Sequence, residues 1–272
     1  MNRPSWSLRP EPAGFGRRGF DAATLRLMDY PAQFEAHADA LLAAASRDLD
    51  APVPSCPGWD CRRLVSHVAR LLASTVRHLP RGTTDPPELV PRPPAEAGEL
   101  TAYYRRMVTE TLTVLRDVDP GAPAWTFVAG FAPEVAGFWP RRLANEFQVH
   151  AWDAAAAFGA PPELVPQLAA DGVDEVLTVL LPAARAAGIS PPGEGTAHVH
   201  LTDLPGEWLV RLNGPAVTVT PEHAKGDAAL RGPAGPVLLA LWGRLDPAAP
   251  GPRGDGLAVH GDAAILAGLR PG

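Results

Sequence analysis

The spacing of apolar residues divides the chain into a long helical part and a shorter part with strand-like alternation. Apolar side chains recur at helical intervals in five segments, residues 31–49, 61–79, 95–118, 141–159 and 162–188. Asp60 directly precedes the second segment, where a helix N-cap is expected. A Pro-rich loop and an aromatic-rich loop separate the first four segments, and four long helices of this kind predict an antiparallel bundle.

The pattern changes after Gly188, which closes the fifth helical segment. Residues 197–203 and 207–212 alternate apolar and polar side chains and predict a hairpin, with a third strand at 216–220. The remaining expected elements are a helix at 235–245, a strand at 257–261 and a helix at 262–269. The fold class is therefore predicted as α+β, with a disordered extension at 1–27, a helical bundle at 28–188 and a small α+β domain at 189–272.

Composition excludes several classes of protein. Residues 1–27 carry charges, Pro and Gly but no apolar stretch, so they do not resemble a secretory signal and are expected to be dispensable. No apolar run approaches the roughly 20 residues of a membrane span. The net charge of −6 and the lack of a basic run argue against nucleic acid as a partner. Cys56 and Cys61, without a signal sequence, indicate a reducing, cytoplasmic setting, and we interpret both as small buried side chains.

One helical segment combines a carboxylate and an imidazole at a spacing that suits metal binding. Glu146 and His150 are four residues apart and lie on one face of the predicted helix. A catalytic zinc site usually takes three protein ligands, and His67, predicted to point inward from the segment 61–79, is the candidate third ligand. From the residues alone, a metal site and a hydrogen-bonded cluster both stay open.

Two stretches resemble a known family. "VPSCPGWDCRRLVSHVARLL" at 53–72 and "RRLANEFQVHAWDAAAAFG" at 141–159 resemble signatures of the mycothiol-dependent maleylpyruvate isomerase family, and the resemblance extends over about residues 28–272. It implies a DinB-like four-helix bundle followed by a sterol-carrier-like domain. It also implies a divalent metal, usually Zn²⁺, held by the residues that match His67, Glu146 and His150. The sequence departs at Asn145, where many relatives have His, but this position is not a family ligand.

The resemblance implies an enzyme whose metal activates the thiol of mycothiol, an actinobacterial cosubstrate, for attack on a small electrophile. An isomerase would release the thiol again, whereas an S-transferase would leave it on the product. Arg244 matches a family position associated with activity, where an arginine could hold a substrate carboxylate. A helix-end role for Arg244 stays open. We expect a monomer or weak dimer. The alternative is a non-enzymatic, metal-stabilised module that binds a small molecule or regulates a partner.

Other polar residues allow weaker interpretations. Asp153 could orient a ligand histidine or cap a turn. Arg141 and Arg142 could face an anion, but we interpret them as solvent-facing. His198 and His200 alternate onto one face of a predicted strand, but no third ligand is evident nearby, so we interpret them as solvated or paired across the hairpin.

Overall fold

The computed structural model describes residues 28–159, 161–247 and 256–272, and its contacts divide them into two units. Residues 29–164 form one unit, and the chain from residue 165 onward forms the other. The predicted boundary after Gly188 differs from this division. The extension predicted at 1–27 lies outside the described residues. No helix in the described ranges is both long enough and apolar enough to cross a membrane.

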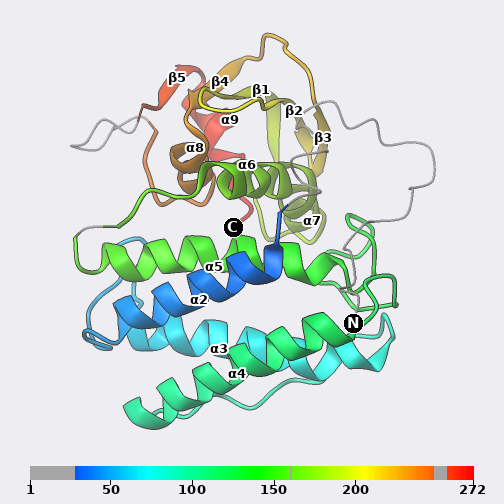
Figure 1. The fold of residues 1–272 in the computed structure, drawn as a ribbon. Helices are drawn as coiled ribbons and strands as arrows, with labels where there is room; N and C mark the ends of the chain where they lie inside the picture. The colour runs from blue at the N-terminus through cyan, green and yellow to red at the C-terminus, as the bar shows by residue number, and fades with distance from the viewer. Residues whose placement is uncertain (1–27, 160, 248–255) are drawn as a thin grey trace. The chain divides into compact units, whose positions relative to one another are not determined.

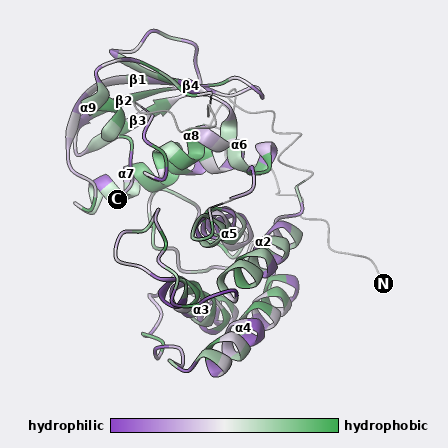
Figure 2. Cartoon of the chain, turned by 90° about the vertical axis from the view of Figure 1, so that its left-hand side faces the viewer, coloured by the Kyte–Doolittle hydropathy of each residue, from purple (hydrophilic) through white to green (hydrophobic). Residues whose placement is uncertain are grey.

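The first unit contains four main helices, as predicted (Figure 1). They are α2 (Tyr30–Ala45), α3 (Cys61–His78), α4 (Ala97–Asp117) and α5 (Phe138–Ala156), with a short 3₁₀ turn, η1 (Leu79–Arg81), after α3. Helix α2 packs along α5, and α3 packs along α4. Hydrophilic residues, coloured purple, alternate with hydrophobic ones along α3 and α4 (Figure 2), and Leu64, Val65, Val68 and Leu72 of α3 are buried, as their spacing predicts. The amphipathic spacing in the sequence therefore predicted which faces are buried.

Aromatic side chains join the helices of this unit. The rings of Phe34 on α2 and Phe147 on α5 meet edge to face, with centroids 4.8 Å apart. Both side chains are fully buried, and such pairs add stability beyond the area they bury. The buried Tyr104 hydroxyl on α4 donates to the Ala38 carbonyl of α2 at 2.8 Å. These contacts fix α5, the helix that carries Glu146 and His150, within the bundle.

The second unit begins with a helical stretch and continues into a mixed sheet. Its helices are α6 (Pro166–Glu175), the π-turn η2 (Val176–Leu180), α7 (Leu181–Ala186), α8 (Ala234–Leu241) and α9 (Ala263–Ala267). Its strands are β1 (Gly193–Leu201), β2 (Glu207–Gly214), β3 (Ala216–Thr220), β4 (Ala228–Gly232) and β5 (Ala258–Gly261). The fifth predicted helical segment thus belongs with the sheet, because α6 packs on α8 and α7 packs on β3.

The sheet order is β3-β2-β1-β4-β5, and only the β1–β4 pair is parallel. The predicted hairpin, third strand, last strand and two helices of this unit are all present. Strand β4 was missed, although it lies between β1 and β5. Buried and partly exposed residues alternate along β1, so that one face of the strand enters the core and the other carries polar side chains.

Candidate metal centre

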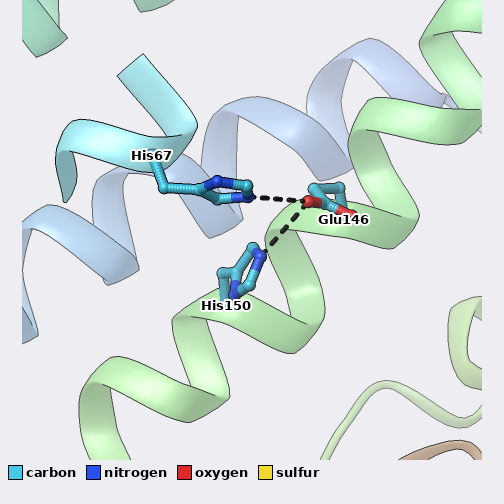
Figure 3. Close-up of side chains that lie close together, drawn as sticks. All are labelled: His67, Glu146 and His150. Carbon is cyan, nitrogen blue, oxygen red and sulfur yellow. Dashed lines mark hydrogen bonds and ion pairs between the residues drawn. The ribbon is translucent and has the colours of Figure 1, made fainter. Parts of the chain in front are cut away.

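His67, Glu146 and His150 come together at the contact between α3 and α5 (Figure 3). One carboxylate oxygen of Glu146, Oε1, lies 3.5 Å from His67 Nε2 and 3.2 Å from His150 Nε2. The two imidazole rings stand nearly perpendicular, with centroids 5.3 Å apart. The structure therefore brings together all three side chains that the sequence selected as metal ligands. Their role as ligands is a prediction.

The spacing of these donor atoms suits a zinc-sized ion. Two ligands bound to one ion at about 2.1 Å with a tetrahedral angle are about 3.4 Å apart. The two distances from Glu146 Oε1, 3.5 and 3.2 Å, match this value, and all three ligand atoms lie within 4.8 Å of one another. Two imidazoles and a carboxylate are also a donor set that zinc accepts in catalytic sites. The residues present thus fit a divalent ion.

His67 does not point inward with the apolar side chains of α3, as the sequence had suggested. Its side chain is 43% exposed, whereas Leu64, Val65 and Val68 are fully buried. His67 lies at the edge of the buried stripe, where it still reaches Glu146 (Figure 3). An edge position keeps one side of the cluster accessible to solvent and small molecules.

Asp153 supports His150 from the next turn of α5. Its Oδ2 lies 3.0 Å from His150 Nδ1, and the side chain is fully buried. A carboxylate only accepts, so Nδ1 carries a proton, while Nε2 faces Glu146. The Ser55 hydroxyl donates to Asp153 Oδ1 at 2.6 Å, and the Cys56 thiol lies 3.5 Å from Oδ2. Asp153 thus orients His150, which matches one of the two roles considered from the sequence, and the role of His150 as a ligand stays a prediction.

A tight turn before α3 places Ser55 and Cys56 against Asp153. The turn is closed by backbone bonds from Val53 N to the Trp59 carbonyl at 2.9 Å and from Trp59 N to the Cys56 carbonyl at 2.9 Å. Gly58 has a φ of +79°, a backbone conformation that residues other than glycine rarely adopt. The turn also sets the Trp59 ring 5.1 Å from the His67 ring, between centroids. The predicted N-cap follows, since Asp60 accepts from Arg63 N at 2.7 Å.

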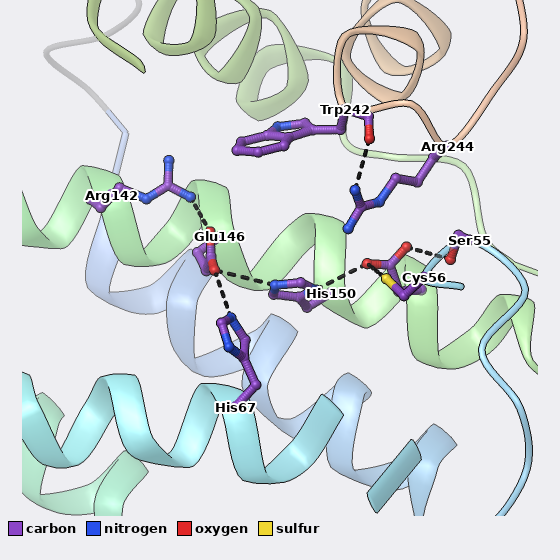
Figure 4. A network of polar contacts seen from close by, with 9 residues as sticks. Ser55, Cys56, His67, Arg142, Glu146, His150, Trp242 and Arg244 are labelled. Atoms are coloured by element: carbon purple, nitrogen blue, oxygen red, sulfur yellow. Dashed lines mark hydrogen bonds and ion pairs between the residues drawn. The ribbon is translucent and has the colours of Figure 1, made fainter. Parts of the chain in front are cut away.

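The interpretation of Arg142 as solvent-facing was wrong. Arg142 is 3% exposed, and its guanidinium pairs with Glu146 Oε2, one turn along α5 (Figure 4). Each oxygen of Glu146 therefore has its own partners, two histidines on Oε1 and an arginine on Oε2. The sequence analysis missed this pair, although the i, i+4 spacing of Arg142 and Glu146 is a signal that could have found it.

The electrostatics of the cluster follow from burial and from these partners. Burial alone would raise the pKa of Glu146, but the charges of Arg142 and His150 hold that pKa well below its usual range. Burial would likewise lower the pKa of His150, yet Glu146 and Asp153 raise it to about 9. In the metal-free cluster at neutral pH, His150 is therefore an imidazolium beside a carboxylate, and a divalent ion would displace its proton.

The structure also describes the surroundings of Cys61 and Arg244, which the sequence had singled out. Cys61 is buried, and desolvation raises the pKa of its thiol, which fits a structural side chain. Arg244 follows α8 in the second unit, where its Nη1 donates to the Trp242 carbonyl at 2.7 Å (Figure 4). This bond is the kind expected of a helix-end arginine. A role of Arg244 in catalysis stays a prediction.

Comparison with known proteins supports the resemblance seen in the sequence. Residues 30–155 match the model of the mycothiol maleylpyruvate isomerase N-terminal domain, and residues 167–268 match that of the MDMPI C-terminal domain, which belongs to the same family. The chain belongs to the mycothiol-dependent maleylpyruvate isomerase family. The two matched ranges fall on either side of the division between the two units.

Solved structures share the fold of this family member. The crystal structure of the mycothiol-dependent maleylpyruvate isomerase matches with a TM-score of 0.57 and 14% sequence identity, over 85% of this chain and 91% of that chain. A structure of a histidine-to-alanine mutant of that isomerase matches equally well, with a TM-score of 0.57. At this identity the likeness establishes the fold alone. Among proteins with curated functions, none is significantly similar in sequence.

Proposed function

We propose that the protein is a metal-dependent enzyme that uses mycothiol as a cosubstrate against a small electrophilic molecule. The observation that carries the proposal is the shared contact of Glu146 Oε1 with two imidazoles from two helices. This N, O, N set is typical of catalytic zinc sites, which take three protein ligands and leave a position for water or substrate. The family is named after mycothiol, and we therefore propose mycothiol as the thiol cosubstrate.

His67, Glu146 and His150 would hold the ion, which would lower the pKa of a coordinated thiol and so favour a thiolate nucleophile at neutral pH. The chain's own residues prepare this site. Asp153 fixes the His150 tautomer that presents Nε2, and Arg142 holds Glu146 by its other oxygen. The single carboxylate offsets half of the charge of a divalent ion, so that the site keeps a net charge of +1 toward an incoming anion.

The substrate is proposed to be a small electrophile that carries a carboxylate. Arg244 is the proposed partner of that carboxylate, because its planar guanidinium can bind a carboxylate with two parallel hydrogen bonds. Isomerisation and S-transfer begin with the same nucleophile. The three ligands are compatible with both outcomes, and the shape of the substrate pocket decides between them.

Calorimetry with mycothiol tests this function. Full-length protein loaded with Zn²⁺ is expected to bind mycothiol, and protein stripped with a chelator is expected to bind it at least about 100-fold more weakly, since the ion supplies the thiolate contact. Glu146→Gln, which removes the charge but keeps the size of the side chain, should behave like stripped protein. Cys56→Ser and Cys61→Ser are matched controls and should retain binding, because neither thiol is a proposed ligand.

Equal mycothiol affinity of the loaded and stripped forms, or no binding by either, would exclude a metal–thiol mechanism. A protein that binds the metal but not the thiol would instead favour the non-enzymatic, metal-stabilised module.

A further inference from the structure

A second cluster of histidines surrounds a carboxylate on the sheet of the C-terminal unit. His198 and His200 are two residues apart on β1, so their side chains project from the same face of the strand. Glu207, at the start of β2, lies directly opposite His200 in the antiparallel register. Directly opposed residues share a face, which places the Glu207 carboxylate beside both histidines.

The opposite face of β1 is the one that packs into the core. Ala197, Val199 and Leu201 are buried there. Helix α9 covers this face, because a Cβ built on Gly195 would lie 2.7 Å from the Ile265 side chain. The histidine face is therefore not the one that holds the sheet to its helices.

The Glu207 carboxylate contacts three imidazoles. Its Oε2 lies 3.4 Å from His198 Nε2 and 2.6 Å from His223 Nδ1, and its Oε1 lies 3.5 Å from His200 Nε2. The exposed fraction of the side chain is 12% for His198 and 29% for Glu207 but 78% for His223. The cluster thus has three partly buried members on strands, since the His200 side chain is also 29% exposed, and one exposed member on a loop.

The third histidine comes from the loop 221–226, between β3 and β4, which is attached to the sheet on both sides of His223. Glu222 Oε1 pairs with Arg211 Nη2 of β2 at 2.8 Å. Gly226 packs so closely on β1 that an added Cβ would lie 2.9 Å from His198 N. These two attachments hold His223 over the sheet. Sequence spacing alone does not reveal them, which is why the pair His198 and His200 seemed to lack a third ligand.

This arrangement repeats the plan of the bundle site. There, two histidines share one oxygen of Glu146 and Arg142 holds the other. Here, two histidines share Oε2 of Glu207, and His200 contacts Oε1. The ligand atoms of His198, Glu207 and His223 all lie within 4.8 Å of one another.

We propose that His198, Glu207 and His223 form a second divalent-metal site, with His200 as the residue that positions Glu207. The distance of 3.4 Å from His198 to Glu207 matches two ligands of one zinc-sized ion. The distance of 2.6 Å from His223 is that of a hydrogen bond, so this side chain must move outward by somewhat less than 1 Å, which its exposure permits. Imidazole and carboxylate donors favour zinc or a related transition metal over Mg²⁺ or Ca²⁺.

An ion at this site would tie the loop 221–226 to β1 and β2, because His223 is the one proposed ligand that the loop contributes. The sequence provides a specific reporter of this loop. Lys225 is the only lysine of the chain, lies two residues after His223 and is exposed. A lysine-specific protease therefore has a single cleavage point, and it lies within the loop that the ion would immobilise.

The test is proteolysis of the full-length chain without a histidine tag, stripped of metal and then incubated with or without Zn²⁺. Zinc is expected to slow cleavage after Lys225 by at least about 10-fold, because cleavage requires the loop to open. In His223→Asn, zinc should have no effect on the rate. His260→Asn is the matched control, since His260 is an exposed histidine of β5 in the same sheet but outside the cluster, and this variant should be protected like the wild type.

Calorimetry with Zn²⁺ separates this site from the bundle site. The wild type should bind two equivalents, His150→Ala should keep the sheet site, and His223→Asn should keep the bundle site. If the proposed enzyme function proves wrong, zinc should still slow cleavage after Lys225, because the two candidate sites share no residue. Cleavage that zinc does not slow in the wild type, or slows equally in His223→Asn, would overturn the proposal and leave a network of hydrogen bonds only.

Discussion

At the scale of single residues, the contact between Asp153 and His150 leads to a prediction about metal affinity. Asp153→Asn keeps the volume of the buried side chain but removes the charge that accepts the His150 Nδ1 proton at 3.0 Å. Partners that orient a ligand histidine typically contribute 10- to 100-fold in metal affinity, so we expect a loss of about that size for the bundle site. Competition with a chromophoric zinc chelator measures it.

The control for this variant is Glu110→Gln, which removes a carboxylate from the exposed Arg106–Glu110 pair on α4. It should bind zinc as the wild type does. If Asp153→Asn also binds with unchanged affinity, then Asp153 serves the turn at Ser55 and Cys56 rather than the histidine.

Helical spacing was enough to place Glu146 and His150 on one face and to select His67 as the candidate third ligand, and the family resemblance implied the same three residues. The exposure of His67 was not predictable, because a residue at the edge of an apolar stripe can turn to either side. Arg142 shows the reverse case. Its charge suggested solvent, but its partner one turn away allows it to be buried. Strand register places Glu207 beside His198, and the path of the loop 221–226 places His223 beside both. Neither the register nor the loop path can be read from the local spacing of residues.

At the scale of elements, Asp60 is expected to stabilise α3, the helix that carries His67. The Asp60 side chain accepts from Arg63 N at 2.7 Å, which satisfies one of the free amides at the helix start. Asp60→Ala should lower the free energy of unfolding by about 1 kcal/mol, and urea denaturation of the metal-free protein measures this. Glu88→Ala, in an exposed loop, should change it by less than about 0.5 kcal/mol.

The elements predicted best are those whose pattern is long. The four bundle helices span 16 to 21 residues each, enough turns for apolar spacing to identify a buried face. Strand β4 has five residues, Ala228–Gly232, and two of them are Gly and Arg, which gives too short an alternation to recognise. It exists because β1 and β5 supply its hydrogen bonds on both edges. This is a tertiary effect that the local sequence does not contain.

At the scale of the whole molecule, the domain boundary predicted from the sequence differs from the division between the two units, which lies after residue 164. A change from helical to alternating periodicity suggested a boundary after Gly188, yet the helices from Pro166 to Ala186 pack with the sheet. Trp208 of β2 illustrates why, since its buried indole donates to Asp174 of α6 at 3.1 Å. A sheet with one apolar face requires helices to cover it, wherever they lie in the sequence.

This division leads to a prediction about two fragments. Residues 29–164 and 165–272 each hold an extensive set of internal contacts, and each contains one complete cluster of candidate ligands. We expect both fragments to fold separately, as judged by circular dichroism and cooperative thermal unfolding, and each to bind one equivalent of Zn²⁺. Zinc should raise the melting temperature of each, because an ion that binds only the folded form stabilises it.

His150→Ala should abolish the zinc-induced shift in melting temperature in the first fragment alone, and His223→Asn should abolish it in the second alone. A fragment that folds but takes up no zinc would remove its cluster from consideration as a metal site, and a fragment that stays unfolded would show that the two units depend on each other for stability.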